Sequence, residues 1–171
     1  MPIGDLAIAS ADDCPAIEVV FARGTNDAPG LGNVGGAFVD ALRGKVGGRS
    51  VGTYAVNYPA SFDFLAAAGG ANDASAHIQY MVNNCPDTRL VLGGYSQGAA
   101  VIDVISAVAV FGNPATKFSN PITSSVFGGR AIDLCKDGDP ICSRGRNPFA
   151  HSDYVSAGLT QQAASFVSGL L

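Results

Sequence analysis

One serine of this chain stands in a sequence that suits nucleophilic chemistry. The run Gly94–Gly98 reads Gly-Tyr-Ser-Gln-Gly and fits the pattern Gly-x-Ser-x-Gly, between an apolar run that ends at Gly93 and a helical stretch. Such a strand–turn–helix junction exposes the serine hydroxyl at a helix N-terminus, where the helix dipole favours an oxyanion. A glycine-rich turn capped by a serine is the alternative, but the flanking strand and helix favour Ser96 as a nucleophile.

A serine hydroxyl needs a base, and the chain contains two histidines. His77 lies in a polar stretch that is predicted to be helical, ahead of the serine, and we expect it on the surface. His151 follows the last predicted strand, in a loop. Because α/β-hydrolases place the serine first, then the acid and then the histidine, the order along the chain favours His151 as the base.

The acid should lie between the serine and the histidine. Four aspartates fall there: Asp103, Asp133, Asp137 and Asp139. Asp103 belongs to the predicted helix after the nucleophile and Asp133 to the middle of a strand. Asp137 and Asp139 lie in the loop from Cys135 to Cys142, where a disulfide would hold a carboxylate rigidly toward the imidazole. An acidic solvent turn is the alternative for this loop, and spacing alone does not choose between Asp137 and Asp139.

These residues must be positioned by an α/β fold, because short apolar runs alternate with helical stretches. The predicted strands are 17–22, 50–56, 89–93, 108–111 and 131–134, and the predicted helices are 35–42, 72–84, 98–106 and 161–170. In the second of these helices, Ile78, Met81 and Val82 are expected on one side. The pattern predicts a three-layer α/β/α sandwich around a central five-stranded parallel sheet.

One connection is unusually short for such a fold. Only eleven residues separate Ser96 from Val108, and most of them belong to the predicted helix. A parallel crossover needs about a dozen residues or more. We therefore infer that a surface loop near Ala107 either has been deleted from the protein or is missing from the printed sequence.

Four cysteines and no Cys-x-x-Cys pair favour two disulfides over a zinc site. We expect the pairs Cys14–Cys85 and Cys135–Cys142, since the short second loop closes without threading. Four free core thiols in a cytosolic protein are the alternative. Disulfides imply an oxidising compartment, and the protein is therefore expected to be secreted.

Composition narrows the class of protein further. The length suits one domain, residues 1–171, with 1–13 as an extended N-terminal segment. A hydrophobic content of 47% rules out a disordered chain, and a net charge of −4 with scattered basic residues argues against a nucleic-acid binder or a protein that acts mainly on an anionic membrane. No apolar run is long enough to span a bilayer. Residues 1–10 do not resemble a signal peptide, so we expect a mature or re-engineered start from which the export signal has been removed. We also expect the protein to be a monomer.

The chain resembles the cutinase family of α/β-hydrolases over nearly all of its length from Cys14 onward. The resemblance rests on Phe-Ala-Arg-Gly-Thr at 21–25, the run around the serine, Phe-Gly at 111–112, and Cys-x-x-Gly-Asp-x-x-Cys at 135–142 followed by His151. It implies that Asp139 is the acid and that the backbone amides of Gln97 and Thr25 form an oxyanion hole. It also agrees with the expected cysteine pairs, whereas similar proteins carry a longer connection near Ala107.

The expected activity is hydrolysis of carboxylic esters through an acyl-enzyme on Ser96, with no metal and no organic cofactor. Phe62, Ile141 and Phe149, with Pro140, are candidates for a groove that binds an apolar acyl chain; ordinary loop packing is the alternative. No insertion resembles a lid. The resemblance implies short- to medium-chain esters, cutin-like polyesters or lipids as substrates. An acetylxylan esterase of the same fold and a secreted binding protein without turnover are the rival interpretations.

Overall fold

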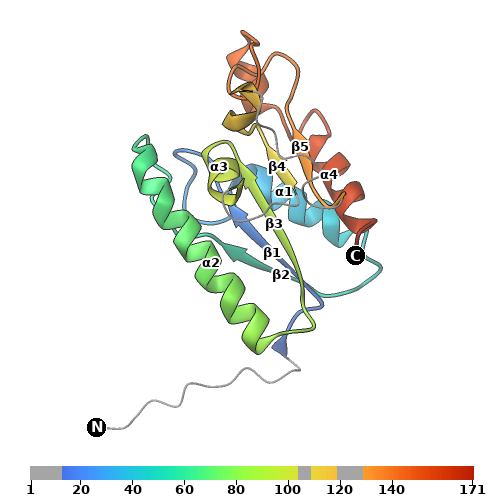
Figure 1. The fold of residues 1–171 in the computed structure, drawn as a ribbon. Helices are drawn as coiled ribbons and strands as arrows, with labels where there is room; N and C mark the ends of the chain where they lie inside the picture. The colour runs from blue at the N-terminus through green and yellow to red at the C-terminus, as the bar shows by residue number, and fades with distance from the viewer. Residues whose placement is uncertain (1–12, 104–108, 119–128) are drawn as a thin grey trace, which may run out of the picture.

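The computed structural model describes residues 13–103, 109–118 and 129–171 (Figure 1). The expected extended segment at 1–13, apart from its last residue, lies outside the described residues. The short connection near Ala107 also lies outside them, as do the last residues of the predicted helix 98–106 and the first residue of the predicted strand 108–111.

The predicted five-stranded parallel sheet is confirmed, in the order β2-β1-β3-β4-β5. Its strands are β1 (Ile17–Ala22), β2 (Val51–Ala55), β3 (Arg89–Tyr95), β4 (Ala109–Phe111) and β5 (Ile132–Leu134). Every residue of β1 is buried, because the strand lies inside the sheet and helices cover both of its faces. This explains why β1 is a nearly continuous apolar run with no alternation of polar residues.

Helices on both faces complete the predicted three-layer sandwich (Figure 1). On one face, α1 (Gly32–Arg43) and α4 (Leu159–Ser168) enclose an aromatic cluster in which the rings of Phe21, Phe38 and Phe111 lie 6.0–6.4 Å apart. On the other face, α2 (Ala67–Asn84) and α3 (Gln97–Asp103) cover the side chains of Val20 and Val110.

One detail of the predicted α2 is wrong. Met81 is buried and Ile78 packs against the core, but the side chain of Val82 is 59% exposed. The buried side of the helix runs through Gly70, Ala74 and Met81, with Ile78 at its edge. Since successive helical residues are turned by about 100°, Val82 falls beyond that edge and faces solvent.

The carboxyl ends of the parallel strands meet at one edge of the sheet, which is where ligands bind in open α/β folds. The loops after β1, β3, β4 and β5 all emerge there, at the top of Figure 1. A disulfide joins Cys135 to Cys142 in the loop after β5, and a second joins Cys14, ahead of β1, to Cys85 at the end of α2. Both are the expected pairs. The first fixes the loop that carries Asp139, and the second ties the opposite end of the sheet.

Candidate active site

Ser96 stands on a tight turn between β3 and α3. Its φ of +56° lies in the left-handed region, which is costly for a residue with a side chain, and its amide donates to the carbonyl of Phe111 at 2.8 Å. The turn brings α3 against β1 so closely that a Cβ at Gly98 would lie 2.0 Å from the carbonyl oxygen of Ala22. A Cβ at Gly94 would lie 2.3 Å from the oxygen of Gly98. A Cβ atom does not fit at either position, so both residues must be glycine.

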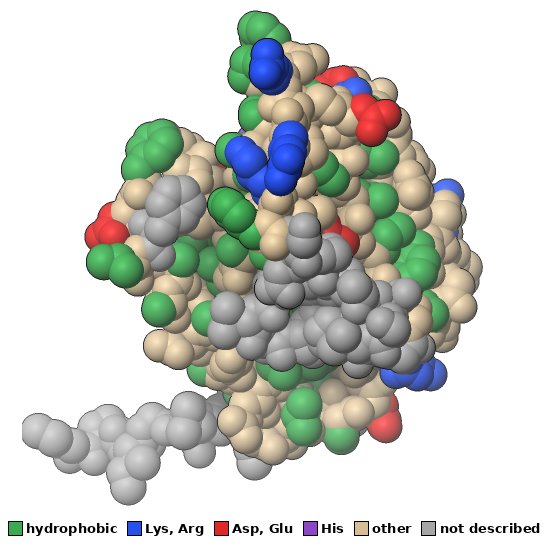
Figure 2. All heavy atoms as spheres, turned by 45° about the horizontal axis from the view of Figure 1, so that its top comes forward, with side chains coloured by type: hydrophobic (Ala, Val, Ile, Leu, Met, Phe, Trp, Pro, Cys, Tyr) green, Lys and Arg blue, Asp and Glu red, His purple; other side chains and the backbone are tan. Residues whose placement is uncertain are grey.

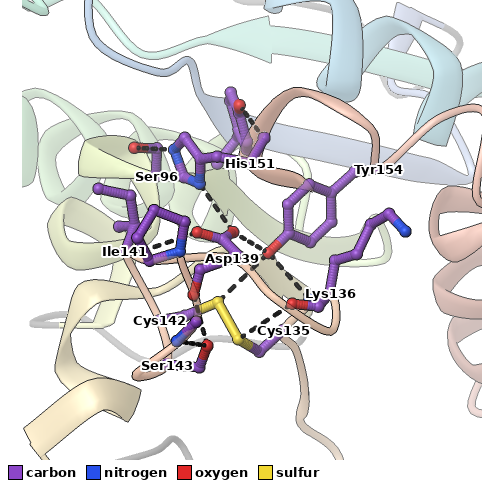
Figure 3. A network of polar contacts seen from close by, with 12 residues as sticks. Ser96, Cys135, Lys136, Asp139, Ile141, Cys142, Ser143, His151 and Tyr154 are labelled. Carbon is purple, nitrogen blue, oxygen red and sulfur yellow. Dashed lines mark hydrogen bonds and ion pairs between the residues drawn. A yellow bond between two sulfur atoms is a disulfide. The ribbon is translucent and has the colours of Figure 1, made fainter. Parts of the chain in front are cut away.

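A chain of hydrogen bonds runs from this serine to a buried carboxylate (Figure 3). His151 Nε2 lies 2.8 Å from Ser96 Oγ, and His151 Nδ1 lies 2.8 Å from Asp139 Oδ2. Asp139 is completely buried, and its Oδ1 accepts a hydrogen bond from the amide of Ile141 at 2.8 Å. In this arrangement a neutral imidazole donates through Nδ1 and accepts the serine proton at Nε2.

The other aspartates weighed from the sequence have different surroundings. Asp133 accepts hydrogen bonds from Asn113 Nδ2 at 3.1 Å and Thr116 Oγ1 at 2.9 Å. Asp137 is exposed in the disulfide loop, and Asp103 is the last residue of α3. The structure thus brings Asp139 to the imidazole, as the family resemblance implied.

Two tyrosines support the histidine–aspartate pair. The ring of Tyr95 stacks on the imidazole of His151 with centroids 5.1 Å apart, and its hydroxyl donates to the His151 carbonyl at 2.5 Å. The hydroxyl of Tyr154 donates to Asp139 Oδ2 at 2.6 Å and accepts from the amide of Lys136 at 3.2 Å. Burial raises the pKa of Tyr95 to about 12. Burial, and then the hydrogen bond to Asp139, raises the pKa of Tyr154, so both phenols remain donors at neutral pH.

Sequence reasoning missed these supporting residues. Tyr95 lies inside the serine motif and Tyr154 lies three positions after His151, so proximity to known motifs was the available signal. Gly112, at a φ of +60°, leaves room for the imidazole, because a Cβ there would lie 2.9 Å from His151 Cε1.

Thr25 and Gln97, the residues expected to form an oxyanion hole, both lie beside the serine. Their side chains meet, with Thr25 Oγ1 3.4 Å from Gln97 Oε1, and the buried Gln97 also donates to the Ser61 carbonyl at 3.1 Å. As the first residue of α3, Gln97 has no helical acceptor for its backbone N–H. Asp27 fixes the loop of Thr25, because its carboxylate accepts from the Gly24 amide at 3.0 Å.

A pocket of about 560 Å³ opens over the serine. Its wall includes two of the three catalytic candidates, Ser96 and His151. The full lining is Thr25, Asp27, Phe62, Tyr95, Ser96, Gln97, Pro114, Lys117, Phe118, Pro140, Ile141, His151 and Ser152. Phe62 and Ile141 were expected to contact substrate and do line the pocket. Phe149 is 82% exposed and is not part of the wall, whereas Phe118, which was not expected, is. Figure 2, turned toward this end, places hydrophobic side chains on both sides of a hollow.

A second hollow, of about 750 Å³, lies elsewhere and is lined by residues that include Arg23, Pro29 and Asn57. Its lining includes neither Ser96 nor either histidine, so the pocket over Ser96 is the candidate active site.

His77 was expected on the surface, and that prediction is wrong. Its side chain is only 15% exposed, its Nε2 lies 2.5 Å from Glu18 Oε1, and its ring stacks on Tyr54 with centroids 3.5 Å apart. The polar face of α2 was misread, because Glu18 points from β1 toward this helix and must be satisfied by a polar partner there.

Within the described parts of the chain, no three histidine, cysteine, aspartate or glutamate side chains are grouped so that they could hold a metal ion. No helix among the same residues has the length and apolar character needed to cross a membrane.

Comparison with known proteins places the chain among ester hydrolases. The family model described as "Cutinase" matches residues 13–171. Carboxylesterase Culp1 of Mycobacterium tuberculosis is 51% identical, over 99% of this chain and 88% of the relative. Phospholipase Culp4 of the same organism is also 51% identical, over 95% of this chain and 82% of the relative. The alignment with Culp1 spans 191 positions, whereas this chain has 171 residues. Culp1 therefore contains residues within the aligned region that this chain lacks.

Solved structures lead to the same group of folds. The cutinase of Trichoderma reesei, in complex with a phosphonate inhibitor, matches with a TM-score of 0.73 and 34% identity, over 92% of this chain and 77% of that one. The catalytic core domain of the acetyl xylan esterase from Trichoderma reesei matches with a TM-score of 0.74 and 25% identity, over 92% of this chain and all of that one.

Proposed function

Because the chain belongs to the cutinase family and is a serine ester hydrolase, we propose that Ser96, His151 and Asp139 form its catalytic triad. The observation that carries this proposal is the continuous hydrogen-bond chain between the three side chains, beside an open pocket. We propose further that the enzyme is extracellular, which its two disulfides support.

The first half of the proposed reaction forms an acyl-enzyme. Ser96 Oγ attacks the ester carbonyl while His151 Nε2 takes its proton, and Asp139 stabilises the resulting imidazolium. The carbonyl oxygen becomes an oxyanion, for which the backbone amides of Gln97 and Thr25 are proposed as donors. Fixed donors of this kind need no reorganisation as the charge develops. The C–O bond to the alcohol then breaks, and His151 protonates the departing oxygen.

The second half of the reaction repeats these steps with water. His151 takes a proton from a water molecule as its oxygen attacks the acyl carbonyl, and the same amides hold the second oxyanion. Ser96 leaves with the proton returned by His151, and the carboxylic acid is released. The side chains of His151 and Ser96 supply the general base and the nucleophile, and backbone amides supply the oxyanion donors.

The proposed substrates are esters with an apolar, short- to medium-chain acyl group, including polyester or lipid surfaces. The pocket supports this proposal because Phe62, Phe118 and Ile141 line it beside the serine. Phe62 is 74% exposed, so its apolar surface is available to a ligand. An acetyl group alone would leave most of such a wall without contact.

Two measurements test the proposal. Ser96→Ala should lower ester hydrolysis by about 10⁴-fold or more with an unchanged folding transition, and an organophosphonate should modify wild-type Ser96 one-to-one. Retained hydrolysis in the variant would reject Ser96 as the nucleophile, and absence of labelling and turnover would favour a non-catalytic binding protein. A rate profile over acyl chains from about two to twelve carbons tests the substrate, because activity confined to acetyl esters would favour a carbohydrate acetyl esterase.

A further inference from the structure

Tyr154 contacts the buried end of the proposed triad. Its side chain is completely buried, and its hydroxyl lies 2.6 Å from Asp139 Oδ2 (Figure 3). This oxygen also accepts the hydrogen bond from His151 Nδ1 at 2.8 Å, whereas Oδ1 accepts from the amide of Ile141. One carboxylate oxygen is therefore shared between the imidazole and a phenol.

We propose that Tyr154 is a positioning residue that sets the pH range of catalysis, by sharing Asp139 Oδ2 with His151. The inference rests on the proposed function of the triad and goes beyond it, because it assigns a role to a side chain that touches neither the serine nor the substrate pocket.

The direction of the effect follows from the charge on the shared oxygen. A phenol that donates to Oδ2 withdraws negative charge from the atom that faces the imidazole. Without the phenol, that charge would attract a proton more strongly, whether the proton rests on His151 or on Asp139. Removing the hydroxyl should therefore extend the protonated, inactive form of the pair to higher pH.

The phenol is held as a donor to the carboxylate. The amide of Lys136 donates to the Tyr154 oxygen at 3.2 Å, and an amide N–H cannot accept a proton. The disulfide sulfur of Cys142 lies 3.4 Å from the same oxygen but is a much weaker acceptor than a carboxylate, so the phenolic hydrogen is directed to Asp139. Burial raises the pKa of Tyr154, so the phenol stays protonated throughout the range in which a histidine titrates.

Other charged groups near the pair have their own partners or face the pocket. Lys136 Nζ lies 3.3 Å from Asp153, and Lys117 donates to the Pro140 carbonyl at 2.9 Å. Asp27 lines the pocket in the loop after β1 and accepts from the Gly24 amide. Among the described residues, hydrogen bonds to Asp139 Oδ2 come from His151 and Tyr154 alone. A substitution of Tyr154 leaves the charges of the other groups unchanged.

The first test is the pH profile of kcat/KM for Tyr154→Phe, with Tyr80→Phe as the matched control. Tyr80 lies on α2, half exposed and away from the triad. We expect the acid limb to move upward by about half a unit to one unit in Tyr154→Phe and to stay in place in Tyr80→Phe. A purely structural role would lower the rate at every pH without moving the limb.

A second variant keeps the phenol and changes its strength. Replacing Tyr154 by 3-fluorotyrosine makes the hydroxyl a stronger donor in nearly the same volume, so the acid limb should move downward. This variant decides the question if Tyr154→Phe does not fold. An unmoved limb in folded Tyr154→Phe, or a limb that fluorination leaves unmoved or shifts upward, would overturn the proposal.

Failure of the triad itself has a different signature, because it would appear as retained hydrolysis in Ser96→Ala. The two proposals can therefore fail separately.

Discussion

The chain has two histidines, and each contacts a buried carboxylate, at opposite ends of the sheet. His151 lies 2.8 Å from Asp139 at the carboxyl end, and His77 lies 2.5 Å from Glu18 near the amino end. The exposed fractions of the two imidazoles are also similar, 19% and 15%. Distance to an acid and burial therefore do not distinguish the catalytic candidate from the other histidine.

The surroundings of the rest of each ring do distinguish them. Nε2 of His151 reaches the oxygen of Ser96, and the ring borders a pocket. The ring of His77 stacks on Tyr54, the ring centroid of Tyr80 lies 6.2 Å from that of His77, and His77 Nε2 contacts Glu18. The His151–Asp139 pair is the one proposed to transfer a proton in catalysis, whereas the His77–Glu18 pair satisfies a carboxylate that β1 carries into the interior.

The largest expected effect comes from replacing each histidine by glutamine. His151→Gln should lower kcat/KM by about 10⁴-fold or more, because no other base lies within reach of Ser96 Oγ among the described residues. His77→Gln should leave hydrolysis nearly unchanged and lower the free energy of unfolding by about 1–3 kcal/mol, because it disturbs the buried Glu18. Steady-state rates and urea unfolding of both variants check this. A large rate loss in His77→Gln would erase the distinction drawn between the pairs.

The carboxylates should divide in the same way. Asp139→Asn should lower kcat by about 10³- to 10⁴-fold, because an amide nitrogen facing Nδ1 would favour the tautomer that cannot accept the serine proton. Glu18→Gln should preserve kcat and lower the free energy of unfolding by about 1–2 kcal/mol. Rates are compared at equal concentrations of folded protein. If Asp139→Asn kept its activity, another residue would have to orient His151.

The two disulfides offer a third contrast between the ends of the sheet. Replacing Cys135 and Cys142 by alanine should lower kcat by about 10- to 100-fold, because the loop that carries Asp139 would be free to move. Replacing Cys14 and Cys85 should leave kcat unchanged but remove about 4 kcal/mol of stability, against about 2.5 kcal/mol for the shorter loop. Turnover and unfolding midpoints of both double variants give the comparison. Equal loss of kcat in both would mean that the Cys135–Cys142 bridge has no special role at the site.

The smallest effect should be one of selectivity. Phe62→Ala removes part of the pocket wall and should lower kcat/KM for an octanoyl ester by about tenfold, with little change for an acetyl ester. Val82→Ala, an exposed apolar substitution on the helix of His77, is the control and should change neither rate. An equal loss for both esters in Phe62→Ala would show that Phe62 supports the fold rather than the acyl chain.

The parts of the site that depend on consecutive residues, or on the order of residues along the chain, could be predicted from the sequence. The strand, turn and helix around Ser96 are consecutive, and the order of residues was enough to choose His151 over His77. The sequence did not show whether Asp137 or Asp139 is the acid, because they are two positions apart in the same loop. Only the folded structure shows that Asp139 is buried. The family resemblance made that choice, and the contact with His151 agrees with it.

Contacts between distant elements were beyond the reach of the sequence. Glu18 in an apolar strand gave no sign that His77, 59 residues later, would cover it. The role of Tyr154 could not be predicted either. It contacts Asp139, 15 positions earlier, only when the chain between them folds back around the disulfide.

The close approach of α3 to β1 has a consequence for how the family evolves. Gly94 and Gly98 are held by backbone contacts that involve no catalytic atom, so selection for a stable fold alone would preserve them. A descendant that lost its nucleophile through drift would become a pseudoenzyme that still carried both glycines around an altered centre. The glycines of the motif thus record ancestry, whereas Ser96, between them, reports on turnover.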